Sequence, residues 1–547
     1  MIKIKSFILV LLFAFNFGAI SAFGQSNGFE VLKNLEIMNQ IYEHLDLYFV
    51  DEPQNGKLSK TGIDAMLKEL DPYTVYYHES NIEDYRLMTT GQYGGVGALV
   101  RRMGDDTYFA EPYEGNPAQK SGIKAGDKIV SIDGKNMHKK STDEVSSALK
   151  GPKGTTIKVE VDRKGEGIKV IDITRDEIKI PDVPYSGILE NKIGYVKLNS
   201  FTQTAASDVK SAIEKMKGEG MEKLILDLRG NGGGLLIEAV KIVNFFVPQN
   251  TVVVTTKGRV KEENRVYKTL EEPIAENIKL VVLIDDGSAS ASEIVAGSLQ
   301  DLDRAVVIGQ TSFGKGLVQR TYDLKYGSKV KITIAKYYTP SGRCVQRLEY
   351  YDKENGSKPK EVPDSLLKTF QTKGGRKVID GRGIEPDIAT ELEDLSRLAG
   401  MLLTGNHIFN YATDYAIKNK TIAEAGTFKL SDAEFNEFKA YVLAQDFKYN
   451  TASEEMLKKV KETAEKEGYF EDVKSEYDQM LTKLTPSKER DLDKFKTEIS
   501  EMLENEIVSR YYFQKGRTLD SFRYDRALNK AKSVLMSDTE YNGVLKK

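Results

Sequence analysis

One short serine-rich stretch has the residue types that nucleophilic catalysis requires. Residues 287–293 read Gly-Ser-Ala-Ser-Ala-Ser-Glu and follow an apolar run at 280–284. We expect a buried strand to end there and a helix to begin, which exposes a side chain and directs free backbone N–H groups to the same place. A serine at this junction could attack a carbonyl while those N–H groups stabilise the oxyanion. The alternative is that the serines only cap the helix, and the candidate nucleophiles are Ser288, Ser290 and Ser292.

A nucleophilic serine needs a base, and lysine is the available choice. The chain has four histidines, and none lies in a stretch typical of catalysis: His44, His78, His138 and His407. Lys315 lies between two glycines, in a predicted turn at 311–316. Its amine must be neutral to act as a base, so its pKa must fall from ~10.4 by about 3 units, which burial without a counter-charge can supply. An ordinary surface turn is the alternative.

Gln319 follows Lys315 by four residues. A neutral amide can orient a neutral lysine without restoring its affinity for a proton, as a carboxylate would. Four residues of straight strand span ~13 Å, so a bend between the two residues is required. The alternative is a polar residue on one face of a sheet.

The second unusual feature is a glycine-rich turn. Residues 227–234 read Asp-Leu-Arg-Gly-Asn-Gly-Gly-Gly and follow an apolar strand at 224–228. Glycines let the backbone approach a substrate with its N–H groups free. One N–H from Gly233 or Gly234, together with that of Ala291, would make a two-donor oxyanion hole. The alternative is a tight turn between a strand and a helix.

Composition excludes several other classes of function. The chain has 547 residues and a formal charge of −3, so it has no bulk attraction for nucleic acid. Its single cysteine, Cys344, can form neither an internal disulfide nor a cysteine zinc site. We therefore expect no metal and no cofactor.

The N-terminal residues have the pattern of a signal peptide. Lys3 and Lys5 precede a nearly continuous apolar run at 7–20, and Ala22-Phe-Gly24 offers small residues for cleavage. The run is short for a membrane span, although an uncleaved anchor is the alternative. We predict removal of residues 1–24, which leaves a charge of −5 because two lysines are lost, and a soluble protein outside the cytoplasm, in a periplasm or the medium.

The rest of the chain predicts a multidomain α/β protein. Residues 25–90 have the apolar spacing of helices, with Leu32, Leu35, Met38, Ile41 and Leu45 on one face. A mostly-β module with strands at 128–133 and 156–161 and a helix at 142–149 occupies 91–178, and strands alternate with helices over 179–395, which favours a layered core with parallel strands. Residues 396–547 are rich in Lys and Glu and read as a helical appendage, with an apolar stripe that would also suit self-association or an adaptor: Leu492, Phe495, Ile499, Met502, Leu503 and Ile507.

Together these segments resemble the C-terminal processing peptidases, also called tail-specific proteases. The motifs that carry the resemblance occur in the family's order: 227–234, 287–293, 314–316 with Gln319, 338–343 (Tyr-Thr-Pro-Ser-Gly-Arg) and 383–387 (Gly-Ile-Glu-Pro-Asp). Ser290 precedes Lys315 by 25 residues, as the nucleophile precedes the lysine in that family, and this spacing selects Ser290. The resemblance implies a Ser–Lys dyad oriented by Gln319. The acidic pair Asp285-Asp286 departs from the Asn-rich turn of the family.

Residues 91–178 resemble the family's PDZ domain. Gly94, Gly95, Val96 and Gly97 match its carboxylate-binding loop, and Leu70-Asp-Pro-Tyr73 resembles a motif ahead of it. A PDZ groove binds the end of a chain as an added strand, with loop N–H groups on the terminal carboxylate. The resemblance therefore implies an exported serine endopeptidase that cleaves proteins at or near their C-terminal tails. The alternatives are an inert PDZ-bearing scaffold that binds tails and, from the α/β core alone, acyl-thioester chemistry.

Overall fold

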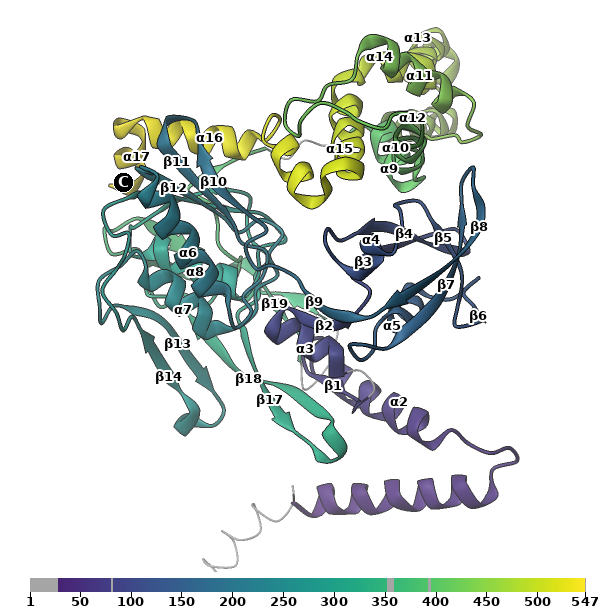
Figure 1. The fold of residues 1–547 in the computed structure, drawn as a ribbon. Helices are drawn as coiled ribbons and strands as arrows, with labels where there is room; N and C mark the ends of the chain where they lie inside the picture. The colour runs from purple at the N-terminus through teal and green to yellow at the C-terminus, as the bar shows by residue number, and fades with distance from the viewer. Residues whose placement is uncertain (1–27, 80–81, 352–358, 392–394, 547) are drawn as a thin grey trace, which may run out of the picture. The chain divides into compact units, whose positions relative to one another are not determined.

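The computed structural model describes residues 28–79, 82–351, 359–391 and 395–546 (Figure 1). Within them the chain divides into two compact units. The smaller unit comprises the described residues up to 78 with 321–332 and 350–351, and the larger comprises the remainder. The predicted signal peptide at 1–24 lies outside the described residues. Among the helices that are described, none is long and apolar enough to span a bilayer.

In the smaller unit, two helical segments precede one short strand. Residues 28–48 are helical, α2 spans Asn55–Lys68 and β1 spans Val75–Tyr77. β1 pairs antiparallel with the beginning of β18 (Lys329–Tyr338). Between α2 and β1, the Asp71 carboxylate accepts the N–H groups of Tyr73 and Thr74, both at 2.8 Å, so this aspartate closes the turn that follows the helix.

The apolar spacing at 28–48 marks a helix but not a buried face. Leu32, Leu35, Met38 and Ile41 are each at least 47% exposed. The 3.6-residue period predicts the helix correctly, whereas burial also requires an opposing surface, which the described part of this unit does not supply.

The mostly-β module of the larger unit has one antiparallel sheet, in the order β3-β4-β5-β7-β8, with β6 beside β5 and a separate β2–β9 pair. The predicted strands and helix are confirmed as β5, β7 and α5, and Ser141 and Glu144 form a capping box that begins α5. The elements are α3 (Ile82–Thr90), β2 (Gln92–Gly95), β3 (Ala98–Met103), β4 (Asp106–Pro112), α4 (Pro117–Lys120), β5 (Lys128–Ile132), β6 (Lys135–Asn136), α5 (Thr142–Leu149), β7 (Thr156–Arg163), β8 (Gly167–Thr174) and β9 (Asp176–Lys179).

The α/β core is built on a six-stranded sheet in the order β10-β11-β12-β15-β16-β23, which is parallel from β11 onwards. The expected strand–turn–helix alternation is therefore present. Its elements are β10 (Tyr185–Leu189), β11 (Ile193–Lys197), α6 (Ala205–Gly218), β12 (Lys223–Asp227), α7 (Leu236–Asn244), β15 (Lys279–Ile284), α8 (Ala291–Asp301), β16 (Val306–Gly309) and β23 (Ile388–Ala389).

A second sheet and two short strand pairs complete this part of the chain. β18 pairs with β13 and β17, and β13 pairs with β14. The bounds are β13 (Val252–Gly258), β14 (Arg265–Lys268), β17 (Leu317–Asp323), β19 (Leu348–Glu349), β20 (Lys360–Glu361), β21 (Thr369–Gln371) and β22 (Lys377–Ile379).

The C-terminal region is helical, as predicted, and has a core of its own. Leu492, Ile499, Leu503 and Ile507 from the predicted stripe are fully buried. The helices are α9 (Arg397–Thr404), α10 (His407–Lys418), α11 (Asp432–Leu443), α12 (Ala452–Glu467), α13 (Phe470–Leu484), α14 (Lys488–Lys494), α15 (Lys496–Ser521), α16 (Arg526–Met536) and α17 (Asp538–Leu545).

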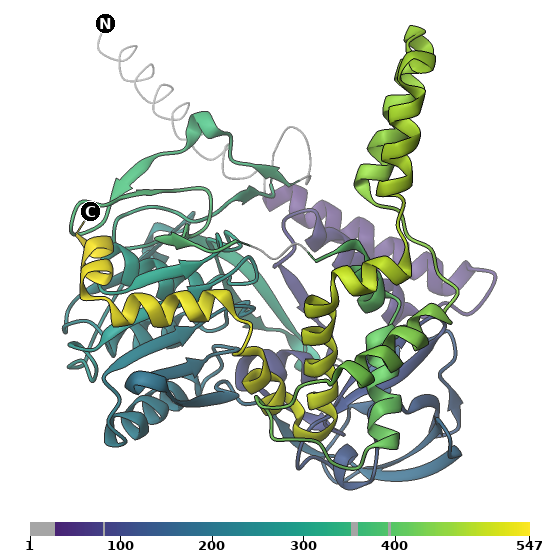
Figure 2. The same ribbon diagram turned by 90° about the horizontal axis from the view of Figure 1, so that it is seen from above.

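The last two helices correct the interpretation of 396–547 as an appendage, because α16 and α17 belong to the α/β core (Figures 1 and 2). Successive strand residues point to opposite faces of a sheet. Leu224 and Leu226 of β12 therefore pack with α6, α7 and α8, while Ile225 between them packs with α16. The sheet is covered on both faces, as a parallel sheet must be.

Leu528 of α16 is fully buried against the sheet, so Leu528→Ala should destabilise the larger unit by about 2–5 kcal/mol through the cavity it leaves. Urea unfolding followed by far-UV circular dichroism measures the change. Leu403→Ala on α9, where the side chain is 41% exposed, is the control and should cost less than about 1 kcal/mol. Equal effects of the two substitutions would show that α16 contributes nothing to the core.

Candidate active site

Ser290 lies at the junction between β15 and α8, as the sequence predicts. It is the residue before the first turn of α8, and its backbone has φ 57° and ψ −112°. This conformation is rare for a residue with a side chain and persists only where neighbouring contacts enforce it. Ser290 is partly exposed, whereas Ala291 directly after it is buried.

The other two candidate serines have structural roles. The Ser288 hydroxyl is buried, donates to the carbonyl of Leu228 at 2.9 Å and accepts the N–H of Asp285. The Ser292 hydroxyl is buried and donates to the carbonyl of Asn231 at 2.8 Å. Both hydroxyls are therefore committed to the backbone, and Ser290 alone of the three has access to solvent.

Glu293 connects the serine segment to the lysine segment. Its Oε2 accepts the N–H of Ser290 at 2.8 Å and the N–H of Lys315 at 2.9 Å. Its Oε1 accepts the Ser312 hydroxyl at 2.6 Å and the N–H of Gly314 at 2.7 Å. The backbone nitrogens of Ser290 and Lys315 are therefore at most about 5.7 Å apart, the sum of the two distances to their shared acceptor.

The electrostatics of Glu293 follow from its complete burial. Burial raises the pKa of this carboxyl above its usual range, and the hydrogen bonds from Ser312, Lys315, Ser290 and Gly314 counteract part of that rise. Sequence reasoning gave Glu293 no role, although a serine followed three residues later by a glutamate is the pattern of a capping box.

Lys315 precedes β17 and Gln319 lies within it. Lys315 belongs to the turn before β17, and Gly316 after it donates its N–H to the amide oxygen of Gln346 at 2.6 Å. Gln319 lies within β17, and its amide nitrogen donates to the Thr333 hydroxyl at 3.2 Å. A direct hydrogen bond between Lys315 and Gln319, with the bend that it would require, stays a prediction.

The glycine-rich turn lies against the nucleophile segment. A Cβ atom added at Gly233 would lie 2.8 Å from the Cβ of Ser290 and 2.9 Å from the nitrogen of Ala291, so only glycine fits there. The Gly233 N–H donates to the side chain of Asn231 at 2.9 Å. Among the described residues, no hydrogen bond is found for the N–H groups of Gly234 and Ala291. Of the two predicted glycines, Gly234 is therefore the one with a free donor.

A buried charge network holds the start of this turn. The Asp227 carboxylate accepts hydrogen bonds from Tyr195 at 2.6 Å, from Lys197 at 3.2 Å and from the Arg229 side chain. Burial alone would raise the pKa of Asp227, but the charges of Arg229 and Lys197 outweigh it and hold the pKa below its usual range. The carboxylate stays ionised, which fixes the strand end from which the turn departs.

Tyr337 is a further residue that sequence reasoning missed. Its buried hydroxyl donates to the carbonyl of Ser290 at 3.2 Å, and burial raises its pKa well above the ordinary value. It therefore acts as a neutral donor that fixes the strained residue. No local pattern in β18 distinguishes it from other strand tyrosines.

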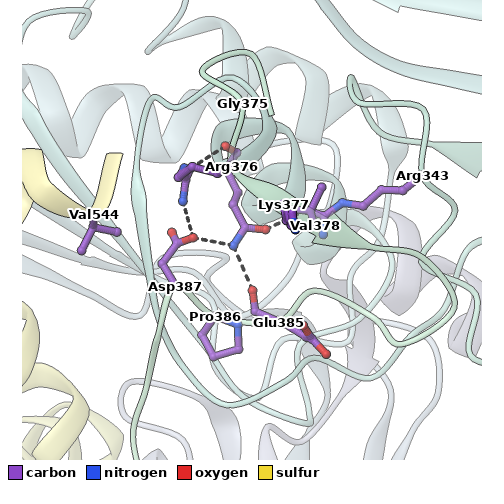
Figure 3. Close-up of a pocket in the computed structure, with 10 residues that line it drawn as sticks. Arg343, Gly375, Arg376, Lys377, Val378, Glu385, Pro386, Asp387 and Val544 are labelled. Atoms are coloured by element: carbon purple, nitrogen blue, oxygen red, sulfur yellow. Dashed lines mark hydrogen bonds and ion pairs between the residues drawn. The ribbon is translucent and has the colours of Figure 1, made fainter. Parts of the chain in front are cut away.

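A cavity of about 540 Å³ lies at the far end of α8 (Figure 3). Its lining includes Gln300, whose amide nitrogen donates to Asp387 and to the carbonyl of Glu385, both at 2.9 Å. Arg376 donates to the carbonyl of Gln300 and pairs with Asp387, while Arg343 donates to the Gln300 side chain. The motifs at 338–343 and 383–387 therefore anchor the end of α8, about 15 Å from Ser290.

Only part of the predicted carboxylate-binding loop has N–H groups that could bind a carboxylate. Gly94 and Gly95 belong to β2 and pair with β9, and the Gly94 N–H donates to Glu83 of α3 at 2.9 Å. Among the described residues, no hydrogen bond is found for the N–H groups of Val96 and Gly97. β3 follows them and is an edge strand, since β4 is its only partner among the strands that the structure describes. The described residues include no cluster of three or more side chains able to hold a metal ion.

Three family profiles match the chain. Peptidase family S41 matches residues 192–350, a PDZ domain matches 108–163, and the "Probable PDZ-protease, C-terminal helical domain" matches 398–535. The first covers Ser290, Lys315 and the glycine-rich turn, so the family assignment falls on the residues that the geometry brings together.

Two curated relatives and one solved structure are similar to the chain. The "Carboxy-terminal processing protease CtpA" of Bacillus subtilis is 32% identical over 376 residues, which cover 66% of this chain and 78% of that protein. The "Probable CtpA-like serine protease" of Staphylococcus aureus strain N315 is 35% identical over 315 residues, which span 57% of this chain and 62% of that relative's length. The solved photosystem II D1 C-terminal processing protease is 26% identical, with a TM-score of 0.36, over 65% of this chain and 93% of its own.

The nucleophile segment, the glycine-rich turn and the lysine turn thus lie within the matched core, and the chain belongs to peptidase family S41.

Proposed function

We propose that this protein is a serine endopeptidase that cleaves polypeptides at or near their C-terminal tails. The observation that carries the proposal is the shared acceptor at Glu293: one carboxylate oxygen holds the backbone of both Ser290 and Lys315 beside a glycine-rich turn. The backbones of two segments 25 residues apart are thereby held close together, which supports a Ser–Lys dyad.

In the proposed mechanism the neutral amine of Lys315 takes the proton of the Ser290 hydroxyl as that oxygen attacks the scissile carbonyl. The oxyanion lies between the N–H groups of Ala291 and Gly234, which the structure leaves without other acceptors among the described residues. The protonated Lys315 then gives its proton to the leaving amine, and water, deprotonated by the same amine, releases the acyl group. Gln319 orients Lys315 through its amide.

Ser290→Ala should abolish peptide cleavage, and Lys315→Ala should lower kcat by about 10²–10⁴-fold, because each removes one half of the proton transfer. Casein digestion and a fluorogenic peptide assay measure both. Ser211→Ala on α6, where the hydroxyl bonds only within its own helix, is the control and should retain full activity. Full activity of a folded Lys315→Ala protein would exclude this lysine as the base.

Mapping the C-termini of exported and cytoplasmic proteins in wild-type cells and in a Ser290→Ala strain tests both the cleavage of tails and the location of the enzyme. The signal pattern at 1–24 supports an enzyme that works outside the cytoplasm. Shortened tails should therefore appear among exported proteins. A difference confined to cytoplasmic proteins would contradict the proposed location, and no difference would favour the inert scaffold.

Glu293 is proposed to set the dyad's geometry without touching the substrate. All four groups around its carboxylate are donors, so the amide of a glutamine would face N–H groups with its own NH₂. At least one buried donor would lose its acceptor, at a cost of about 1–3 kcal/mol.

Glu293→Gln should therefore lower both thermal stability and kcat, the latter by at least about tenfold, while KM changes little. Thermal melting and steady-state kinetics provide the two measurements. Glu454→Gln is the matched control, since Glu454 is also largely buried in the first turn of its helix, α12, and its loss should leave kcat unchanged. Equal kcat values for the two variants would show that Glu293 does not set the geometry of the site.

Tail recognition is proposed to occur at the loop formed by Gly94, Gly95, Val96 and Gly97. The free N–H groups of Val96 and Gly97 would receive the terminal carboxylate, and the open edge of β3 would pair with the peptide as an added strand. Gly94 and Gly95 shape the loop without donating to the ligand, because their backbones pair with β9 and the Gly94 N–H is bonded to Glu83.

A peptide with an apolar C-terminus should bind the full-length Ser290→Ala protein at least about tenfold more tightly as the free acid than as the C-terminal amide. The difference arises because amidation removes the charge that receives the loop's hydrogen bonds, which is worth roughly 1.5–3 kcal/mol. Fluorescence anisotropy with a labelled peptide measures it. Equal affinities for acid and amide would exclude recognition of a terminal carboxylate.

A further inference from the structure

Asp525, at the start of α16, contacts the glycine-rich turn from a region with no assigned role. Its Oδ1 accepts the N–H of Leu528 at 2.9 Å, so it caps α16. Both of its oxygens also accept hydrogen bonds from the Arg229 guanidinium, from Nη1 at 2.9 Å and from Nη2 at 2.6 Å. One carboxylate therefore joins the helix that covers the sheet to the turn beside Ser290.

Arg229 forms hydrogen bonds through both its side chain and its backbone. Its side chain bonds to Asp227 through Nε, at 3.0 Å, and through Nη2, and to Asp525 through both Nη atoms. Its backbone N–H donates to Asp227 at 2.9 Å, and its carbonyl accepts the Lys197 amine at 2.6 Å. Gly230 follows it directly, so the position of Arg229 determines where the glycines begin.

The charges of this cluster balance only when Asp525 is present. Two cations, Lys197 and Arg229, meet two carboxylates, Asp227 and Asp525, and the two carboxylate side chains are 1% and 12% exposed. Without Asp525 one edge of a largely buried guanidinium would lack an acceptor, which favours rearrangement of Arg229 towards solvent. Gly230 has little stiffness of its own to resist such a movement, and its N–H bond to Asp285 at 2.8 Å is the next anchor of the turn.

We propose that Asp525 is a positioning residue for the peptidase: through Arg229 it fixes the glycine-rich turn at 230–234, so the C-terminal helices complete the oxyanion site. This inference rests on the proposed function. It assigns the C-terminal region a part in catalysis that is distinct from any role in association.

Asp525→Asn in the full-length chain tests this inference. Asparagine is as good a helix cap as aspartate, so α16 should keep its start, while the charge that pairs with Arg229 is lost. We expect kcat to fall at least about tenfold with KM within about twofold, because a misplaced donor affects the transition state more than substrate binding. Hydrogen exchange of the amides at 230–234 should accelerate. Asp525→Glu, which restores the charge, should recover part of kcat.

The matched control is Asp538→Asn. Asp538 lies in the first turn of α17, pairs with Lys279 of the sheet and is 80% exposed, so its charge is equivalent but remote from the turn. Its loss should change neither kcat nor exchange at 230–234. An Asp525→Asn protein with wild-type kcat and wild-type exchange would overturn the inference, as would a fall in kcat no larger than the loss of folded protein.

The exchange measurement also separates this inference from the proposed function. In the Ser290→Ala background it needs no substrate, so it reports on the anchoring of the turn even if the wild-type protein cleaves no peptide. Faster exchange in a protein that cleaves no peptide would support the anchoring role of Asp525 and refute the proposed peptidase activity. Wild-type kinetics of Asp525→Asn, together with an inactive Ser290→Ala protein, would support the peptidase and refute the role of Asp525.

Discussion

The interaction on which the site depends is the acceptance of four hydrogen bonds by one buried carboxylate. Glu293 lies in the first turn of α8, yet three of its four donors come from the segment that carries Lys315. Placing a carboxylate in the interior is costly unless its oxygens are fully bonded. The fold meets that condition only when the two segments lie together, so the burial of Glu293 holds the backbones of Ser290 and Lys315 close to each other.

The site is assembled from segments that are far apart in the sequence. The glycine-rich turn follows β12, the nucleophile follows β15, Lys315 precedes β17, and Asp525 begins α16 nearly 300 residues after Arg229. Parallel strands bring the first two together, because the carboxyl ends of neighbouring strands meet at one edge of the sheet. The contribution of α16 requires that the chain return, after the whole helical region, to cover the second face.

Much of this could be predicted from the sequence, and the failures have physical causes. Gly-Ser-Ala-Ser-Ala-Ser-Glu after an apolar run predicts a strand, a turn and a helix. The pattern leaves three serines open, and only the resemblance to the family, through the separation from Lys315, selects Ser290. Asp525 and Tyr337 were missed because their partners are distant in the sequence. The sequence leaves Gly233 and Gly234 open as the second oxyanion donor, because the bond from the Gly233 N–H to Asn231 depends on a side-chain rotamer. The apolar period at 28–48 predicts a helix correctly but does not decide whether its apolar face is buried.

Helix α8 is anchored at both of its ends, by the hydrogen bonds of Glu293 beside Ser290 and by the arginine–aspartate cluster around Gln300. A helix anchored at both ends can neither shift along its axis nor rotate about it without breaking charged contacts at one end. Accommodation of polypeptides of different sequence must therefore come from the strands and loops that line their path. In the proposed mechanism, Ser290 is then the fixed point to which each scissile bond is brought.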